Sequence, residues 1–379
     1  MKSIRRALPY GRQSIDAHDI KAVVRALKGP FLTQGPAVKA FEGAKYCVAV
    51  ANGTAALHIV VAAVGLKKGH SGVTSPITFL ASANALVYSG IEPLFADIDP
   101  QTVNISPKAL SLAIRKDTKV IIPVHFAGRP ARMKEIAAIA AKNKCFVIED
   151  AAHAIGSRYP DGGRVGNCAY SAMTIFSFHP VKTITTGEGG AVMTNDVKFY
   201  DCLRRLRSHG VMRDPALNRK RGLGPWHYEM QELGFNYRMT DIQAALGLSQ
   251  LNKIDRFIAR RSKIVAKYNA AFKDIPWIRP VSVNDKFCAY HLYVVRVDFN
   301  RLGISRSAFM KRLLDKGVGT QVHYIPIYRQ PFYRKNFGIS PAGFLEANRY
   351  YDECVSLPLF PAMTDRDITK VISAVTGLA

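Results

Sequence analysis

The chain has 379 residues, of which 48% are hydrophobic, and it carries a formal net charge of +25. This hydrophobic content excludes a disordered chain, and the length allows one large core plus a smaller appended domain. The apolar stretch 55–66 is too short to cross a bilayer. Residues 1–12 are basic but lack the apolar run of a secretory signal, so we expect a cytoplasmic protein.

The placement of the cysteines and of the basic residues bears on three alternatives, namely a disulfide framework, a zinc site and a nucleic-acid-binding protein. The six cysteines are scattered and form no CxxC pair, which disfavours a disulfide framework and a zinc site, so we expect no bound metal. A strongly basic chain can bind nucleic acid or attract small anionic substrates. The basic residues are widely spread, however, and the one local cluster, 204–221, can also be a solvated loop.

Strand-like and helix-like segments alternate through the first two thirds of the chain. The predicted strands are residues 47–51, 72–75, 92–97, 120–124, 145–149, 172–177 and 190–194. Helices are predicted at residues 54–64, 81–88, 107–114 and 131–141. This alternation predicts an α/β fold with a mostly parallel, seven-stranded sheet covered on both faces.

The pattern changes in the last third of the chain. A long helical pattern runs from Met239 to Phe272, and Asp241 stands where an acidic side chain favours a helix start. Residues 291–299 and 320–326 are predicted strands, and residues 305–317 are a predicted helix. We therefore expect a large domain over residues 1–250 and a smaller C-terminal α+β domain over residues 251–379.

Candidate functional residues follow the strands of the predicted sheet, where ligands bind in such folds. Gly53 and Thr54 begin a helix whose free N–H groups can hold a phosphate, although many strand-to-helix turns look similar. Asp150 ends an apolar strand and needs a cation or a donor, unless it only caps a helix. Ser177 closes another strand, and Lys182 follows it. Burial would make that lysine a nucleophile, whereas most lysines are solvated.

Three segments stand out as motifs, namely NGTAAL at 52–57, EDAAHA at 149–154 and SFHPVKTITTGEGG at 177–190. Together they resemble the signatures of the fold type I sugar aminotransferases of the DegT/DnrJ/EryC1/StrS family. The resemblance runs essentially end to end and includes residues 32–42, 74–86, 96–107, 123–133, 207–211, 233–251 and 321–328.

The resemblance implies a pyridoxal 5'-phosphate cofactor. Lys182 would bond covalently to it and shuttle the proton between cofactor and substrate carbons. Asp150 would pair with the pyridine nitrogen and Phe79 would stack on the ring. Ser177 would hold the phosphate together with the Gly53–Thr54 turn.

Further positions carry implied roles. His153 stands where many relatives have glutamine, next to the cofactor's ring hydroxyl, and either side chain can hydrogen-bond there. Asn236 would reach the phosphate of the neighbouring subunit's cofactor, which implies a homodimer with shared active sites. Relatives usually carry an acidic pair where this chain has His70 to Gly72. We interpret residues 70–72 as a surface turn and not as a lost catalytic group.

The reaction implied is transamination, since relatives that dehydrate their substrate have histidine in place of Lys182. L-glutamate would donate the amino group, leaving 2-oxoglutarate, and a nucleotide-linked keto-sugar would accept it. The similarity is strongest to the 4-aminotransferases of the pseudaminic acid pathway. Their substrate is UDP-2-acetamido-2,6-dideoxy-β-L-arabino-hex-4-ulose. A GDP- or dTDP-linked 4-keto-6-deoxy sugar, as used by a perosamine synthase, is the alternative.

The substrate contacts are less defined by the sequence. His323 and Tyr328 are candidates for the nucleotide-sugar, or they pack the small domain. Arg213 lies in the basic loop 213–226, which could close over the diphosphate or remain solvated. A regulatory or nucleic-acid-binding protein on this fold is the remote alternative. We expect no added DNA-binding domain, because the fold is expected to begin close to Met1.

Overall fold

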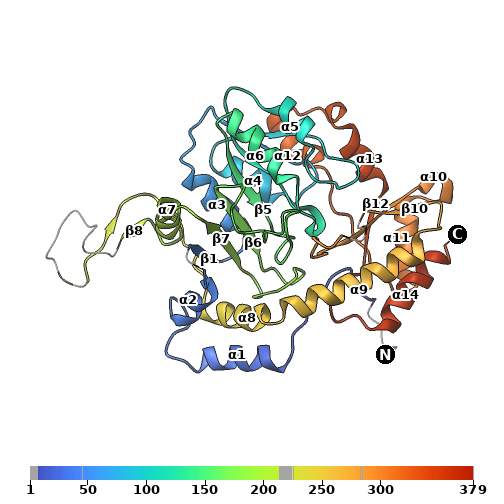
Figure 1. Ribbon diagram of the computed structural model, residues 1–379, viewed down its shortest axis with the longest axis horizontal. Helices are drawn as coiled ribbons and strands as arrows, with labels where there is room; N and C mark the ends of the chain where they lie inside the picture. Colours follow the sequence, from blue (N-terminus) through green and yellow to red (C-terminus); the bar gives the residue numbers. More distant parts are fainter. Residues whose placement is uncertain are drawn as a thin grey trace.

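A computed structural model describes residues 7–44, 46–212, 224, 226–281, 283 and 285–378. Its centre is a seven-stranded sheet with the order β1-β7-β6-β5-β4-β2-β3 (Figure 1). β7 runs antiparallel to both β1 and β6, and the other neighbouring pairs are parallel, which confirms the predicted sheet. The strands are β1 (Cys47–Val50), β2 (Ser71–Thr74), β3 (Glu92–Phe95), β4 (Thr118–Ile122), β5 (Phe146–Asp150), β6 (Met173–Ser177) and β7 (Gly190–Thr194).

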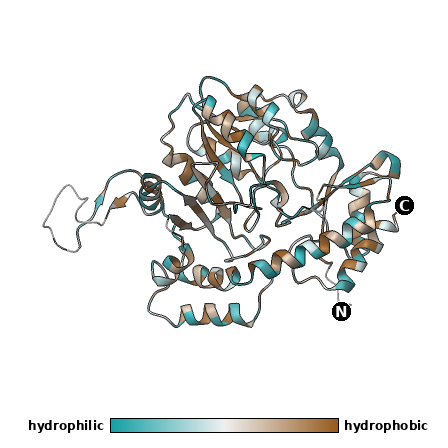
Figure 2. Cartoon of the chain, viewed as in Figure 1, coloured by the Kyte–Doolittle hydropathy of each residue, from teal (hydrophilic) through white to brown (hydrophobic). Residues whose placement is uncertain are grey.

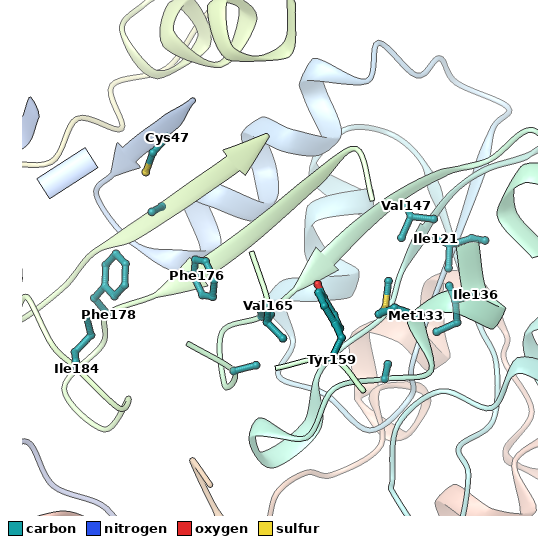
Figure 3. Close-up of a cluster of buried hydrophobic side chains, with 14 of the residues drawn as sticks. Cys47, Ile121, Met133, Ile136, Val147, Tyr159, Val165, Phe176, Phe178 and Ile184 are labelled. Atoms are coloured by element: carbon teal, nitrogen blue, oxygen red, sulfur yellow. The ribbon is translucent and has the colours of Figure 1, made fainter. Parts of the chain in front are cut away.

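Both faces of this sheet are buried, because its strands send alternate side chains into two cores. Phe176 of β6 lies in one core and Ile175 in the other, which explains why the strands have near-continuous apolar sequences. Hydrophobic residues gather in the sheet, and hydrophilic residues are frequent on the outer helices (Figure 2). Figure 3 shows the first core, with Phe176, Val165 and Tyr159 along the sheet.

Helices close the two cores from opposite sides. The core of Phe176 is covered by α2 (Pro36–Glu42), α5 (Pro107–Ala113), α6 (Met133–Lys142) and α8 (Asp241–Leu251). The core of Ile175 is covered by α3 (Gly53–Ala63), α4 (Ala81–Tyr88) and α7 (Val197–Arg207). Asp241, in the first turn of α8, accepts from the Gly35 and Ala37 N–H groups at 2.7 and 2.9 Å and so caps α2, whereas α8 itself is capped by Thr240.

The C-terminal part has its own sheet and core. β10 (Ile278–Pro280), β11 (Tyr293–Val297) and β12 (Cys354–Leu357) form an antiparallel sheet in that order. α9 (Ile254–Phe272), α11 (Arg306–Asp315) and α14 (Asp365–Thr376) pack against it. The other described elements are α1 (Ala17–Leu27), β8 (Val211–Met212), β9 (Glu229–Met230), α10 (Phe299–Leu302), α12 (Pro331–Phe337), α13 (Leu345–Glu353) and three short 3-10 helices, η1 (Phe126–Gly128), η2 (Ile327–Arg329) and η3 (Pro341–Gly343).

The two parts of the chain share a packed boundary. A cluster of aromatic residues joins Phe95 and Phe126 to Tyr328 and Tyr350. Leu8, from the N-terminal segment, packs into the C-terminal core. α8 ends at the position where we expect one domain to pass into the next, and a division at residues 250 and 251 stays a prediction.

Three details differ from the sequence-based prediction. The long helix is two helices, α8 and α9, which break at Asn252 and Lys253. The strand predicted at residues 320–326 is wrong, since in the described part of the chain the segment pairs only through an isolated bridge between Gln321 and Ser356 and forms no ladder. The surface turn predicted at 70–72 is also wrong in part, because residues 71 and 72 begin β2 and are buried.

No helix among the described residues is both long and apolar enough to cross a membrane. In the same part of the chain, no group of three or more histidine, cysteine, aspartate or glutamate side chains is placed to hold a metal ion. The six cysteines are separate thiols.

Candidate active site

Lys182 lies in the tight loop that joins the antiparallel neighbours β6 and β7. The Phe178 N–H donates to the Gly189 carbonyl at 2.8 Å, and the Thr186 N–H donates to the Phe178 carbonyl at 3.0 Å, so the loop is held at its base. Burial lowers the pKa of Lys182 to about 8, and the nearby charge of Asp150 opposes that shift. Such a lysine is available as a neutral nucleophile close to physiological pH.

Asp150 ends β5 and is 4% exposed. Its Oδ2 accepts from the Ser82 hydroxyl at 2.6 Å, and its Oδ1 accepts from the Ala152 N–H at 3.1 Å. Residues 151–157 form turns and no helix, so Asp150 is not the cap of a following helix. Because both donors are neutral, the buried carboxylate remains suited to pair with a cation.

The start of α3 and the end of β6 approach each other closely. Asn52 caps α3, and its side chain accepts from the Ala55 N–H at 2.8 Å. The N–H groups of Gly53 and Thr54 are left as the other donors of the first turn. A Cβ at Gly53 would lie 3.0 Å from Ser177 Oγ, so glycine permits this approach. The helix start and the Ser177 hydroxyl together suit an anion such as a phosphate.

Phe79 and His153 are connected by a residue that the sequence did not single out, Tyr324. Phe79 follows β2 and is 57% exposed despite its large aromatic ring. Its ring centroid lies 6.2 Å from that of Tyr324. His153 is buried, its Nδ1 accepts from the Ala127 N–H at 3.3 Å, and its Nε2 lies 3.1 Å from the Tyr324 hydroxyl. The only sequence signal for Tyr324 was its place directly after the candidate His323.

Three buried histidines lie close to Lys182. Burial lowers the pKa of His153, His291 and His323, and the charge of Lys182 adds to the shift in each. The pKa of His323 falls to about 3. His291 packs on His153 with 4.4 Å between ring centroids, and its Nδ1 is buried without a hydrogen-bond partner in the described part of the chain. All three rings are therefore neutral at physiological pH. No sequence motif singled out His291, which is the first residue of the strand predicted at 291–299.

The two C-terminal candidates are placed differently. His323 is buried, and its Nδ1 lies 2.8 Å from Ser356 Oγ. Its electrostatic interaction with Lys182 places it in the same group. Tyr328 is fully buried and stacks on Phe344 at 4.6 Å between centroids, within the cluster that joins the two parts of the chain. The structure therefore brings His323 to the site and gives Tyr328 a packing environment.

Two other candidates lie apart from this group. Asn236 is exposed in the segment beside β1, where the Tyr237 carbonyl accepts from the Ala51 N–H at 2.8 Å. Arg213 lies outside the described residues. The described start of the basic cluster belongs to α7, where Arg207 Nη1 pairs with Glu42 Oε1 at 2.8 Å, so this part is no solvated loop.

The chemistry of these side chains fits the pyridoxal 5'-phosphate expected from the sequence. Gly53 leaves room beside Ser177 where a Cβ would intrude, and the helix start there supplies N–H donors for a phosphate. Asp150 offers a buried carboxylate to a protonated ring nitrogen. Phe79 offers an exposed ring for stacking, and Lys182 offers an amine of lowered pKa.

Comparisons with known proteins agree with this chemistry. Residues 13–376 match the DegT/DnrJ/EryC1/StrS aminotransferase family. The chain is 41% identical to the spore coat polysaccharide biosynthesis protein SpsC of Bacillus subtilis (strain 168), over 98% of this chain and 97% of that protein. Among solved structures, Helicobacter pylori PseC, an aminotransferase involved in the biosynthesis of pseudoaminic acid, matches with a TM-score of 0.91 and 30% identity over 98% of this chain and 99% of that one. Spr1654 from Streptococcus pneumoniae, solved in its PLP form, matches with a TM-score of 0.89 and 27% identity over 98% of both chains. The chain therefore belongs to the DegT/DnrJ/EryC1/StrS family and is a pyridoxal-phosphate-dependent sugar aminotransferase.

Proposed function

We propose that the enzyme transfers the amino group of L-glutamate to C4 of UDP-2-acetamido-2,6-dideoxy-β-L-arabino-hex-4-ulose, on the route to pseudaminic acid. The observation that carries this substrate is the likeness to Helicobacter pylori PseC, with a TM-score of 0.91 over 98% of the chain. The Bacillus subtilis relative, which is named for polysaccharide biosynthesis, is consistent with a nucleotide-linked sugar.

The geometry above supports a set of cofactor contacts. When bound, pyridoxal phosphate supplies an electron-accepting ring that stabilises the charge left when the substrate carbon loses its proton. We assign the phosphate to the N–H groups of Gly53 and Thr54 and to the Ser177 hydroxyl. Asp150 holds the positive charge at the ring nitrogen, and Phe79 stacks on the ring face.

Lys182 is the group that moves the proton. Its pKa of about 8 lies near the pH at which a general base works well. The three histidines beside it stay neutral in this range, so they hydrogen-bond and pack without competing for the proton.

The substrate side of the site is assigned to the C-terminal segment. We assign His323, which interacts electrostatically with Lys182, to the nucleotide-sugar. Tyr328 supports that segment by packing against Phe344. Arg213, which lies outside the described residues, remains our candidate for the diphosphate, because arginine binds phosphate oxygens in pairs.

We further propose that the enzyme works as a cytoplasmic homodimer with shared active sites. One apolar face of α1 is exposed and carries Ile20, Val24 and Leu27. Two more apolar side chains are exposed near the β8–β9 hairpin, namely Met230 in β9 and Leu233 just after it. This hairpin extends away from the body of the molecule (Figure 1). Monomers rarely expose such surfaces, and a partner seated on the hairpin would meet the segment that carries Asn236.

A half-reaction assay tests the substrate. The enzyme is first treated with glutamate, and the aminated form is then mixed with single nucleotide-sugars while the visible cofactor band is followed. Rapid return of the band with the UDP-linked 4-keto sugar, and slow return with GDP- and dTDP-linked 4-keto-6-deoxy sugars, supports the proposal. The opposite order would replace it with a perosamine-type activity.

A further inference from the structure

Glu149 is a fully buried carboxylate, next to Asp150 in β5, that the proposed cofactor contacts do not use. Burial raises its pKa, but its hydrogen bonds outweigh burial and hold the pKa below the ordinary value, so the group is charged. Four side chains donate to it, namely His125 at 2.9 Å and Tyr159 at 2.6 Å to Oε2, and Ser171 and Thr174 to Oε1. A carboxylate has about four acceptor positions, so none remains for a cofactor or substrate.

The hydrogen bonds of the His125 ring have a fixed direction. The Ala131 N–H can only donate, so His125 Nδ1, at 3.0 Å, accepts and carries no hydrogen. The ring hydrogen is therefore on Nε2, and His125 donates it to Glu149. Both side chains are 0% exposed, so water does not weaken this hydrogen bond. His125 thus ties the segment that follows β4 to the end of β5.

The backbone of the same segment is bonded to Asp150. The His125 N–H donates to the Asp150 carbonyl at 3.1 Å, and the Asp150 N–H donates to the Pro123 carbonyl at 2.9 Å. The ring and the backbone of His125 therefore hold two successive residues of β5, and the position of His125 sets the course of the chain at Asp150.

Glu149 and Asp150 lie on opposite faces of the sheet, because successive side chains of a strand alternate. Tyr159, a donor to Glu149, belongs to the first core (Figure 3). Asp150 instead accepts from Ser82 of α4, which covers the other core. The pair of His125 and Glu149 thus lies behind the strand and can influence Asp150 only through the backbone.

We propose that His125 and Glu149 are positioning residues that direct the Asp150 carboxylate toward the ring nitrogen of pyridoxal phosphate. This inference rests on the proposed contact between Asp150 and that nitrogen. A charge-assisted hydrogen bond is strong only when its distance and alignment are good. Without the pair, the end of β5 shifts and this bond weakens, while the phosphate and stacking contacts, which lie on other segments, remain.

A cofactor analogue without the ring nitrogen isolates this effect. 1-Deazapyridoxal phosphate has a carbon in place of that nitrogen and keeps the phosphate, the aldehyde and the ring. Titration of the cofactor-free enzyme gives the dissociation constants of both compounds, and their ratio reports the Asp150 contact without turnover. We expect the wild type to bind the analogue about tenfold or more weakly, because a hydrogen bond between charged groups is lost. His125→Phe keeps an aromatic ring but removes both ring hydrogen bonds, and it should bring the ratio close to one.

Two further variants and a control separate positioning from general damage. Glu149→Gln keeps an acceptor oxygen for His125 and can donate to the Ser171 hydroxyl, so its ratio should stay near the wild-type value. Tyr159→Phe is the milder change if His125→Phe does not fold, and the loss of one donor to Oε2 should lower the ratio by about two- to threefold. The control is Tyr268→Phe, which removes a buried hydroxyl that donates to the Pro358 carbonyl at 3.0 Å in the C-terminal core. Its ratio should equal that of the wild type.

The outcomes that would overturn the proposal are distinct. In an Asp150→Asn background His125→Phe should leave the ratio unchanged, because it acts through Asp150, and a further change would contradict this route. Equal weakening of both compounds by His125→Phe would show general damage to the fold. A ratio in Glu149→Gln as low as in His125→Phe would show that the charge of Glu149 acts and not its hydrogen bond. If the wild type binds both compounds equally well, the proposed Asp150 contact fails, and this inference fails with it.

Discussion

Lys182→Met should stabilise the cofactor-free protein at neutral pH. Burial lowers the pKa of Lys182 from 10.5 to about 8, so the fold disfavours its charged form. Between these two values the unfolded chain binds a proton that the folded chain does not, and the free energy of unfolding therefore rises with pH. Below pH 8 the charged lysine destabilises the fold by at most about 3 kcal/mol. Partial contact with water reduces this to about 1–2 kcal/mol. Methionine has a similar length and no charge.

Urea unfolding at pH 7 and at pH 10.5, at one protein concentration, measures the difference. We expect Lys182→Met to be more stable than the wild type by about 1–2 kcal/mol at pH 7, and the gap to close at pH 10.5. Lys198→Met is the control, because Lys198 is exposed at the start of α7 and its removal should leave both values unchanged. An equal gap at both pH values, or a variant no more stable than the wild type at pH 7, would refute the burial argument.

Two further predictions concern the phosphate site and the dimer. Gly53→Ala would place a Cβ 2.8 Å from Ser177 Cβ, and overpacking of about 1–3 kcal/mol should weaken cofactor binding about tenfold or more. The control variant Gly343→Ala should bind the cofactor normally, because a Cβ there meets no atom within 4 Å. A fluorescence titration that gives equal cofactor dissociation constants for these two variants would contradict a phosphate site at Gly53 and Ser177. Inactive Lys182→Ala and impaired Asn236→Ala chains, when refolded together, should regain activity, because a mixed dimer holds one intact shared site. Activity that never exceeds the average of the separate variants would argue that each site is built by one chain.

The sequence predicted the sheet and several of its site residues for one physical reason. Both faces of the parallel strands are buried, so the strands stand out as apolar runs, and the polar residues that follow them meet at one edge. Asp150 and Ser177 were found in this way. The close approach of Gly53, which follows β1, to Ser177, which ends β6, shows that the ends of these two strands lie together. The segment QVHYIP has a strand-like apolar pattern, but it pairs only through the isolated bridge between Gln321 and Ser356, because strand pairing depends on a distant partner that the local pattern does not specify.

What the sequence missed depends on contacts between distant segments. Tyr324 matters because His153 lies beside it, and His153 is oriented by the backbone of Ala127. No local pattern encodes such a chain. His291 was missed for the same reason, since its place against His153 is set by the packing of the C-terminal part on the large sheet.

The position of β1 affects how the protein can fold during synthesis. β1 lies at the edge of the seven-stranded sheet, where it pairs with β7 and Cys47 lies opposite Met193. β2, β3 and β4 pair among themselves and can assemble early, but β1 has to wait until β7 has left the ribosome. During that interval its apolar residues and unpaired backbone are exposed, so β1 is the strand most in need of chaperone protection.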